Sequence, residues 1–386
     1  SALGYNALSA NTTGTQNVAV GKSALADNTT ADNNTAVGFN SLVTNTTGDK
    51  NVAVGRSALQ ANTTASNNVA IGDEALKSNT TGHRNIGIGA RAAELNTTGN
   101  SNVTIGYEVL EDNTTGSNNI AIGDSAMEVN TTGSNNTAVG LSALLSNTTA
   151  SNNTAVGSSA LLANTTGSRN TAVGKSAMAA ATTGNENVAI GYAALDAVTI
   201  GSESVAVGDQ AGTSSTGSHN TFIGHAAGGS ATTGSDSVFI GSMAGDHDTV
   251  TTDGDRAVII GSRANASTSG SSQETVLGYN VTGKGSSTFH VIGASGAFHT
   301  GNTTTWSTTS DERIKKDIVD SPVGLAEINQ VKIRNFKYRT PSEITASELQ
   351  KYNLNQLAIN DTNTKVGVIA QELEKVFPNS IKTDDR

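Results

Sequence analysis

The sequence predicts a mainly β fold, a parallel β-solenoid of short stacked coils, and two observations carry that prediction. A glycine that closes an Asn-x-Ala-Val/Ile-Gly motif recurs every seventeen residues from Gly4 to Gly208. The composition is also that of a repeat protein, because only 4% of the 386 residues are aromatic and 15% are charged. A fixed period of this length indicates units that bury an apolar face only by stacking on each other. After Gly208 the period loosens, with equivalent glycines at Gly224, Gly241, Gly261, Gly278 and Gly293.

The motif itself supplies a short strand. Branched residues alternate with Ala in Asn51-Val52-Ala53-Val54-Gly55, the period of two that is typical of a strand with one face inward. A second apolar pair four residues after the glycine is expected to face this strand across a thin coil, which would give two strands and two turns per coil. The branched pairs are expected to form the interior ladder, as in Val18/Val20, Val69/Ile71, Ile86/Ile88 and Ile120/Ile122.

The segments between the apolar pairs have the composition of turns. Asn, Gly and Thr accept unusual backbone angles or bond to neighbouring backbone groups, so Asn-Thr-Thr-Gly and Ser-Asn-Asn are predicted turns. Each Asn-Thr-Thr triplet also fits the N-glycosylation pattern, but stacked turn ladders need the same residues, and we favour the ladder. Rows of Thr suggest ice binding as a minor alternative, although such arrays belong on a flat strand face. The triplets begin at Asn11, Asn28, Asn45, Asn62, Asn79, Asn96, Asn113, Asn130, Asn147 and Asn164.

Charge and composition exclude several classes of partner. The residues after Ser310 contain as many acidic as basic side chains, so the net charge of -10 belongs to the repeat region. An acidic rod repels nucleic acid and anionic membranes, and we expect neither as a partner. Cysteine is absent, no apolar run is long enough to span a membrane, and the six histidines share no repeat position. We therefore expect no metal site and no cofactor.

Because Ser1 lies inside a repeat, we also expect a longer polypeptide.

A thin coil holds few inward apolar side chains, so a single rod would gain from lateral association. Ala at the centre of each strand is compatible with packing against a neighbouring chain. We expect a homo-oligomer, most simply a homotrimer.

The repeats Asn187-Val188-Ala189-Ile190-Gly191 and Ser204-Val205-Ala206-Val207-Gly208 resemble the head repeats of YadA-like trimeric adhesins. That resemblance implies a trimeric, left-handed parallel β-roll.

The chain changes character near residue 310, since all three prolines and only two of 42 glycines lie beyond it. The expected divisions are a repeat shaft at 1–285, final strands and a linker at 286–309, and a mixed α/β domain at 310–386 that continues past Arg386. Within the last division, helices are expected to start at Ser321-Pro322 and Thr340-Pro341, with a strand over 331–338.

This segment contains Ser-Asp-x-Arg-x-Lys at 310–315 and Gly-x-Ile-Ala-Gln-Glu at 367–372. Together the two motifs resemble the self-cleaving intramolecular chaperone of phage endosialidases, tail fibres and neck appendages. The resemblance implies a domain that trimerises the fibre, aids its folding and is released by a Ser-Lys dyad. Ser310 matches the nucleophile and Lys315 the general base, with cleavage between Thr309 and Ser310.

The dyad is chemically sensible, because a lysine can activate a serine when desolvation or a nearby cation lowers its pKa. Arg313 and Lys316 are such cations. Taken alone, residues 311–316 also fit the charged first turn of a helix, and the second motif decides for the dyad. The activity would be at most a single-turnover serine endopeptidase acting on its own chain.

The leading hypothesis is a fibre or tailspike shaft of a virion, which binds a host cell-surface receptor or glycan and carries its own chaperone. The alternative is a bacterial surface adhesin or extracellular filament protein with the same modules. A polysaccharide-degrading spike is disfavoured, since the repeats contain no evident acidic pair or aromatic cleft. Identical coils also invite pairing errors, and a C-terminal clamp on three chains would remove most of them.

Overall fold

The computed structural model describes residues 1–245, 254–268, 270–291, 297–300, 306–307, 329–337, 364–369, 372–373 and 375–376. The chain divides into two compact units, Ser1–Thr309 and Ser310–Arg386. Side chains are described in most of the first unit and in a few short segments of the second. Among the described residues, no helix has the length and apolar character to cross a membrane.

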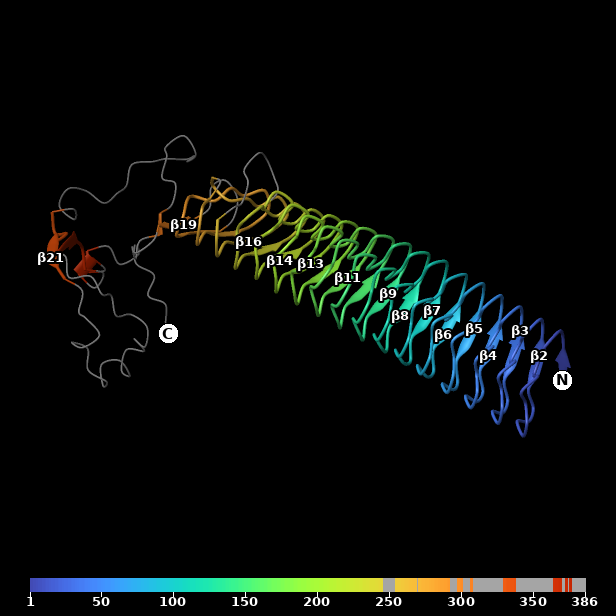
Figure 1. Cartoon of the computed structure of the whole chain (residues 1–386). Coiled ribbons are helices and arrows are strands. Elements are labelled where there is room, and N and C mark those ends of the chain that lie inside the picture. The colour runs from blue at the N-terminus through green and yellow to red at the C-terminus, as the bar shows by residue number, and fades with distance from the viewer. Residues whose placement is uncertain are drawn as a thin grey trace, which may run out of the picture. The chain divides into compact units, whose positions relative to one another are not determined.

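The first unit is a parallel β-solenoid, as the seventeen-residue period predicts (Figure 1). Each coil contributes one short strand that pairs in parallel with the equivalent strand of the next coil, so that Ala19 lies beside Ala36 and Ala36 beside Ala53. These strands are β1 (Ala2–Leu3), β2 (Val18–Val20), β3 (Thr35–Val37), β4 (Val52–Val54), β5 (Val69–Ile71), β6 (Ile86–Ile88), β7 (Val103–Ile105), β8 (Ile120–Ile122), β9 (Thr137–Val139), β10 (Thr154–Val156), β11 (Thr171–Val173), β12 (Val188–Ile190), β13 (Val205–Val207), β14 (Thr221–Ile223), β15 (Val238–Ile240), β16 (Val258–Ile260), β17 (Thr275–Leu277) and β18 (Thr288–Val291).

The strands face the opposite way from the prediction. The central residue of each strand points into the coil, and Ala121 of β8 is fully buried while its neighbour Ile120 is 40% exposed. The predicted interior pairs, Val18/Val20, Val69/Ile71, Ile86/Ile88 and Ile120/Ile122, are instead half-buried or exposed on the outer face. A strand of three residues sends either its centre or both flanks inward. This coil is so thin that one Ala on this wall is enough.

The opposite wall of the coil supplies the larger apolar side chain, but not as a strand. Ala143 and Leu144 are fully buried, which confirms that the second apolar pair faces the strand. The coil therefore contains one strand and not two, because Ser142 and Leu144 have φ of 54° and 53°, left-handed angles that a β-strand excludes. Hydrogen bonds still join this wall to its neighbours, for example from Leu144 N–H to the Ala160 carbonyl at 2.9 Å.

The periodic glycine is required by the closeness of the stacked coils. Gly140 has φ of 135°, and a Cβ there would lie 2.6 Å from the carbonyl carbon of Gly157 in the next coil. No side chain fits such a column of stacked backbone. The exact recurrence of Gly in the sequence therefore follows from the stacking distance.

Near the C-terminal end of the rod, the large and the small interior side chains exchange walls of the coil. Phe222 and Phe239 take the central strand position that Ala holds in earlier coils, and both are fully buried. Gly212, Gly228 and Gly245 take the position that Leu holds. A large residue on the strand wall is thus offset by a small residue on the facing wall, as close packing demands.

The parallel stack ends at β18. The next strand, β19 (Ala297–Thr300), pairs antiparallel with β18, and β20 (Trp306–Ser307) pairs antiparallel with β19. In the second unit, β21 (Arg334–Phe336) pairs antiparallel with β22 (Lys365–Gly367). The predicted helix starts at Ser321-Pro322 and Thr340-Pro341 lie outside the described residues. The left hand of the coil stays a prediction.

Candidate functional site

The asparagines of the Asn-Thr-Thr triplets form a hydrogen-bonded ladder inside the rod. Asn113 donates from Nδ2 to Oδ1 of Asn96 at 2.7 Å and to the Gly116 carbonyl at 3.0 Å, and its own Oδ1 accepts from Asn130 at 2.9 Å. The first rung, Asn11, is half-buried, and the later ones are fully buried. Glycosylation would modify the same Nδ2 atom, so the folded rod cannot accept glycans at the buried triplets. The ladder interpretation is confirmed.

A second asparagine ladder, which the sequence did not reveal, runs beside the strands. Asn119 opens the motif before β8, and its Nδ2 donates to the Gly133 carbonyl at 2.9 Å. Its Oδ1 accepts the backbone N–H of Asn136 in the next coil at 3.0 Å. The recurrence of Asn four residues before each periodic Gly from Gly21 to Gly191 was the available signal. Each of these side chains satisfies buried backbone groups of the coil that follows.

The threonines line a turn and not a strand. The first Thr of each triplet donates to the carbonyl of its counterpart one coil on, as Thr114 does to Thr131 at 3.0 Å. The second Thr, such as Thr115, is exposed. Because the row follows a turn, it lacks the flat strand face that the ice-binding alternative needs.

The outer face of the sheet carries two columns of branched side chains, which we call the outer ribbon: the third residue of each strand from β2 to β17 is Val, Ile or Leu, and the first is Val, Ile or Thr. Each strand presents its first and third residues on this face, so the ribbon extends over successive coils. Tyr107, Leu141 and Tyr192, each directly after a periodic Gly, add exposed apolar area at 49–57% exposure beside it. Ribbon residues with 36–41% exposure are Val18, Val20, Ile71, Ile105, Ile120, Val156, Val173, Ile190, Ile223 and Ile260.

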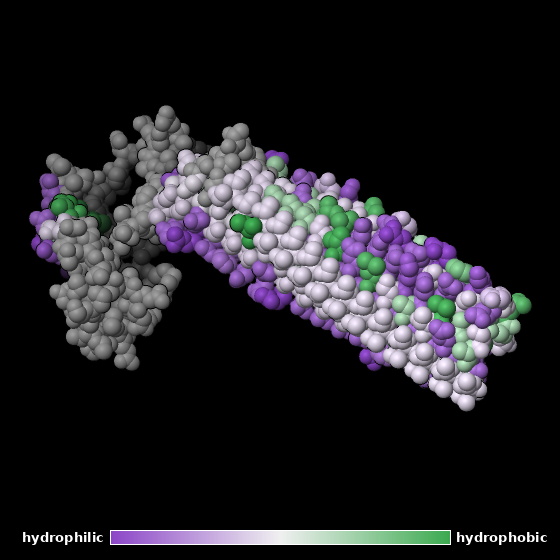
Figure 2. Space-filling view, in the orientation of Figure 1, coloured by the Kyte–Doolittle hydropathy of each residue, from purple (hydrophilic) through white to green (hydrophobic). Residues whose placement is uncertain are grey.

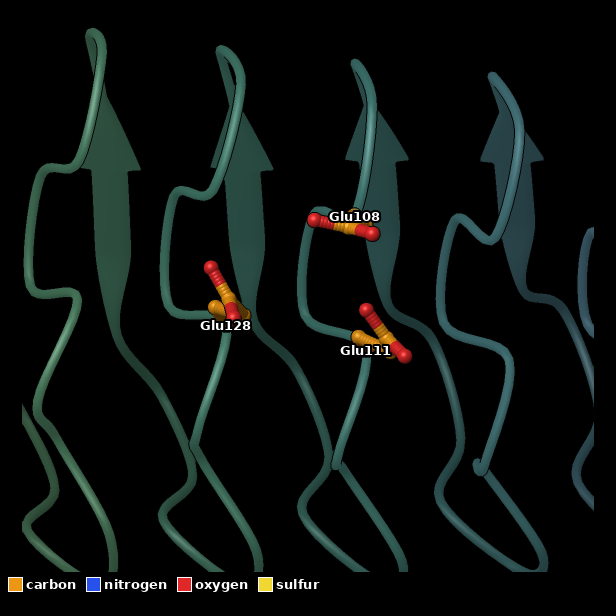
Figure 3. A group of neighbouring side chains, drawn as sticks. All are labelled: Glu108, Glu111 and Glu128. Atoms are coloured by element: carbon orange, nitrogen blue, oxygen red, sulfur yellow. The ribbon is translucent and has the colours of Figure 1, made fainter.

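A charged patch lies over the coils of the N-terminal half, where Figure 2 shows hydrophilic side chains gathered on the rod. At its C-terminal end the carboxylates of Glu108, Glu111 and Glu128 lie within 4.8 Å of one another (Figure 3). Arg91 of the preceding coil pairs with Glu108 and Glu111, and also with Glu94 at 3.0 Å. This group was not predicted from the sequence. Its signal there was the pair of acidic residues Glu111 and Glu128, which are one coil apart.

The electrostatics of this group differ from one carboxylate to another. Burial raises the pKa of Glu111 above its ordinary value, and the nearby Arg91 only partly opposes that rise. Hydrogen bonding to Glu94 raises the pKa of Arg91, which stays charged. Arg91 therefore acts as the internal counter-ion of two coils. The arrangement is an ion-pair network rather than a catalytic pair.

The histidines do not form a common site among the residues whose side chains are described. His83 Nδ1 accepts the Ser66 N–H, and exposed His219 lies between Glu203 and Asp236, with nitrogen to oxygen distances of 3.7 and 3.3 Å. His225 lies 3.8 Å from Asp209, and His290 is buried with Nδ1 2.9 Å from the Thr282 carbonyl. His247 and the side chain of His299 lie outside the described part.

The sequence-predicted dyad also lies outside the described residues. Thr309, Ser310, Arg313, Lys315 and Lys316 all fall there, so the dyad and its cleavage site stay predictions.

The second motif is partly described, and it has a partner that the sequence did not suggest. Arg334 on β21 donates from Nε and Nη2 to the two carboxylate oxygens of Glu372 at 2.9 and 2.7 Å. This pairing lowers the pKa of Glu372. The antiparallel pairing of β21 with β22 brings the predicted strand over 331–338 beside the Gly-x-Ile-Ala-Gln-Glu motif. A cavity of about 400 Å³ next to this pair is lined by Asn329, Gln330, Lys332, Glu372, Lys375 and Val376.

The comparison with protein families decides what this second unit is. Residues 310–382 match the family of the chaperone of endosialidase. The match covers both motifs and confirms the resemblance that they suggest. It describes the chaperone segment alone, which is under half of the chain. No curated protein matches the chain, and no solved structure does.

Proposed function

We propose that this chain is the shaft of a trimeric viral fibre or tailspike, assembled by its own C-terminal chaperone segment and used for attachment to a host surface. The observation that carries the proposal is the chaperone-of-endosialidase match at 310–382, directly after a long parallel β-solenoid. A solenoid of near-identical coils has many wrong pairings of similar energy. A chaperone that holds three C-termini together would remove most of them.

The outer ribbon supports lateral association. Soluble monomers rarely expose a continuous apolar surface over many repeats, and such surfaces mark interaction sites. Burying the ribbon between three parallel copies would place the Val, Ile and Thr side chains of each chain against those of its neighbours, level by level. The surface proposed for association is therefore the row of branched residues, and not the strand alanines that the sequence suggested, because those alanines face the coil interior.

The self-cleavage step follows the dyad chemistry. Lys315 accepts the hydroxyl proton of Ser310 as its Oγ attacks the carbonyl carbon of Thr309. The Thr309–Ser310 peptide bond breaks, and the Ser310 nitrogen takes up a proton as the leaving amine. Water then hydrolyses the Thr309 ester, which leaves a carboxylate on the shaft and restores the Ser310 hydroxyl. The products are a folded shaft and a free chaperone segment.

An alternative proposal is a bacterial surface adhesin, favoured by the resemblance of the strand motif to YadA-like head repeats. The two proposals share the rod and the chaperone and differ in the sequence that precedes Ser1. A virion-attachment domain there would support the fibre, and an export signal or membrane anchor would support the adhesin.

Three forms of the chain test the proposal: the full chain, a truncation at Thr309, and Ser310→Ala. The full chain should give soluble trimers, the truncation should give little soluble trimer, and Ser310→Ala should trimerise but stay uncut. Ser307→Ala, outside the motif, is the matched control and should process normally. Equal yields of trimer with and without residues 310–386 would refute the chaperone role.

A further inference from the structure

Most coils of the rod are interchangeable at their contacts. The buried Ala and Leu, the two asparagine ladders and the strand register repeat from coil to coil with little change. A coil that is looped out would let its two neighbours stack with nearly the same interior. Because the entropy of closing a loop grows slowly with its length, a seventeen-residue loop is not a strong barrier to that error.

The coils between Gly55 and Glu128 differ from the others by a chain of ion pairs, which we call the charge ladder. Arg56 pairs with Asp73 at 2.6 Å and with Glu74 at 2.8 Å, both in the following coil. Lys77 pairs with Glu74 of its own coil and Glu94 of the next, each at 3.2 Å. Arg91 continues the series to Glu108 and Glu111.

The charge ladder has a direction. In each inter-coil pair the cation belongs to the earlier coil and the carboxylate to the later one. Three of the five carboxylates are well shielded, since the side chains of Glu74, Glu94 and Glu111 are 18%, 12% and 12% exposed, whereas Asp73 is 47% exposed and the cations are 34–53% exposed. Shielded pairs in a connected network discriminate between partners more strongly than isolated surface pairs do.

This direction makes a stacking error unfavourable. If the coil from Gly72 to Ile88 were looped out, Arg56 would meet Ala90 and Arg91 instead of Asp73 and Glu74. Two carboxylate partners would be replaced by a like charge. Loss of the coil from Gly106 to Ile122 would set Arg91 against Ser125 and Glu128 instead of Glu108 and Glu111, so Arg91 would lose one of its two carboxylate partners in the next coil.

We propose that the charge ladder is a register key, which specifies the order of coil stacking within one chain where the repeated interior cannot. The inference goes beyond the proposed fibre function, because it concerns the folding of each rod and holds for a fibre or an adhesin. It explains why charges concentrate in a few consecutive coils of a rod that is otherwise rich in Ser, Thr, Asn and Ala.

Cysteine pairs can report the register directly, since the chain contains no cysteine. Thr64 and Thr81 hold equivalent exposed positions in successive coils, whereas Thr64 and Thr98 are two coils apart. Coils stack about 4.8 Å apart, which a disulfide can span, and two coils are about twice that, which it cannot. Thr64→Cys with Thr98→Cys therefore crosslinks only when the coil between them is looped out.

The full chain carrying each cysteine pair is refolded from denaturant under oxidising conditions, and crosslinked peptides are quantified by mass spectrometry. Arg91→Glu should raise the 64–98 crosslink severalfold over the native sequence, because residue 91 would then repel Glu74 at the equivalent position of the native stack and attract Arg56 in the slipped stack. Arg169→Glu makes the same charge change in an isolated pair with Glu186 and should leave the crosslink unchanged.

A second variant separates register from simple loss of folding. Arg91→Glu with Glu74→Arg places opposite charges at equivalent positions of two coils that touch only in the native stack, and should return the 64–98 crosslink toward the native level. Equal 64–98 crosslinking in the native chain, Arg91→Glu and Arg169→Glu would overturn the proposal. So would a rescue variant that slips as often as Arg91→Glu.

Discussion

The ring of Phe222 lies against Gly228, where an added Cβ would be 2.2 Å from the ring carbon Cδ1. Phe222 also packs on Phe239, with ring centroids 5.6 Å apart. The Phe and Gly pair replaces the Ala and Leu pair of earlier coils, so the two positions exchange volume. The position that Gly228 occupies holds Leu at φ near 50° in other coils, and therefore space, not backbone angle, excludes a side chain here.

Gly228→Ala should destabilise the rod by about 1–3 kcal/mol through overpacking against Phe222. The same substitution in a Phe222→Ala background should cost clearly less, since the ring that it meets is gone. Urea unfolding of the four chains gives the coupling energy of this cycle. Additive effects would show that the two residues do not share this space.

Substitution of Asn113 tests the buried ladder formed by the asparagines of the Asn-Thr-Thr triplets. Asn113→Ala should cost about 1–3 kcal/mol, because it leaves Asn96 Oδ1 and a backbone carbonyl without their buried donor. Thr115→Ala removes the same glycosylation pattern but changes only an exposed side chain, so it should shift stability by less than about 0.5 kcal/mol. Similar losses in thermal unfolding for the two variants would argue against the ladder.

The direction of the strands predicts opposite results at neighbouring residues of β8. Ala121→Leu should lower the stability of the rod by about 1–3 kcal/mol, since Ala121 is fully buried in a filled interior. Ile120→Thr should leave the fold of one chain nearly unchanged and weaken association of chains, because Ile120 lies on the outer ribbon. Unfolding by urea and sedimentation of both variants separate the two effects. The opposite result at the two positions would show that the branched residues face the interior of the coil.

The last coil should lose stability in acid. Burial lowers the pKa of His290 below its ordinary value of 6.5, although its bond to the Thr282 carbonyl and nearby Glu274 oppose this and Lys284 adds to it. The unfolded chain therefore binds a proton more readily, so the contribution is complete above about pH 6.5 and falls as the pH drops below it. Hydrogen-exchange protection of β18, relative to β7, should decrease between pH 7.5 and 5. His290→Gln should remove that relative change, and its persistence would exclude His290 as the cause.

The period, the strand position and the chaperone segment could be predicted from the sequence, but the direction of the strands could not be taken from Val-Ala-Val alone. Both faces of such a strand are apolar, so alternation does not tell inside from outside. Phe222 and Phe239 held the missing signal, because large apolar residues at the central position, opposite Gly228, fit only an inward centre. Long-range pairs such as Arg334 with Glu372 depend on tertiary pairing and gave no local pattern.

We propose that three copies of this rod associate through their outer ribbons under the control of the chaperone segment. The native mass of the purified full chain tests this most directly, because it reports copy number, cleavage and glycans together. We expect three copies, either of the intact 39.0 kDa chain or of shafts cut after Thr309, with no added glycan mass on the buried triplets. A folded single chain of 39.0 kDa as the stable species would contradict it.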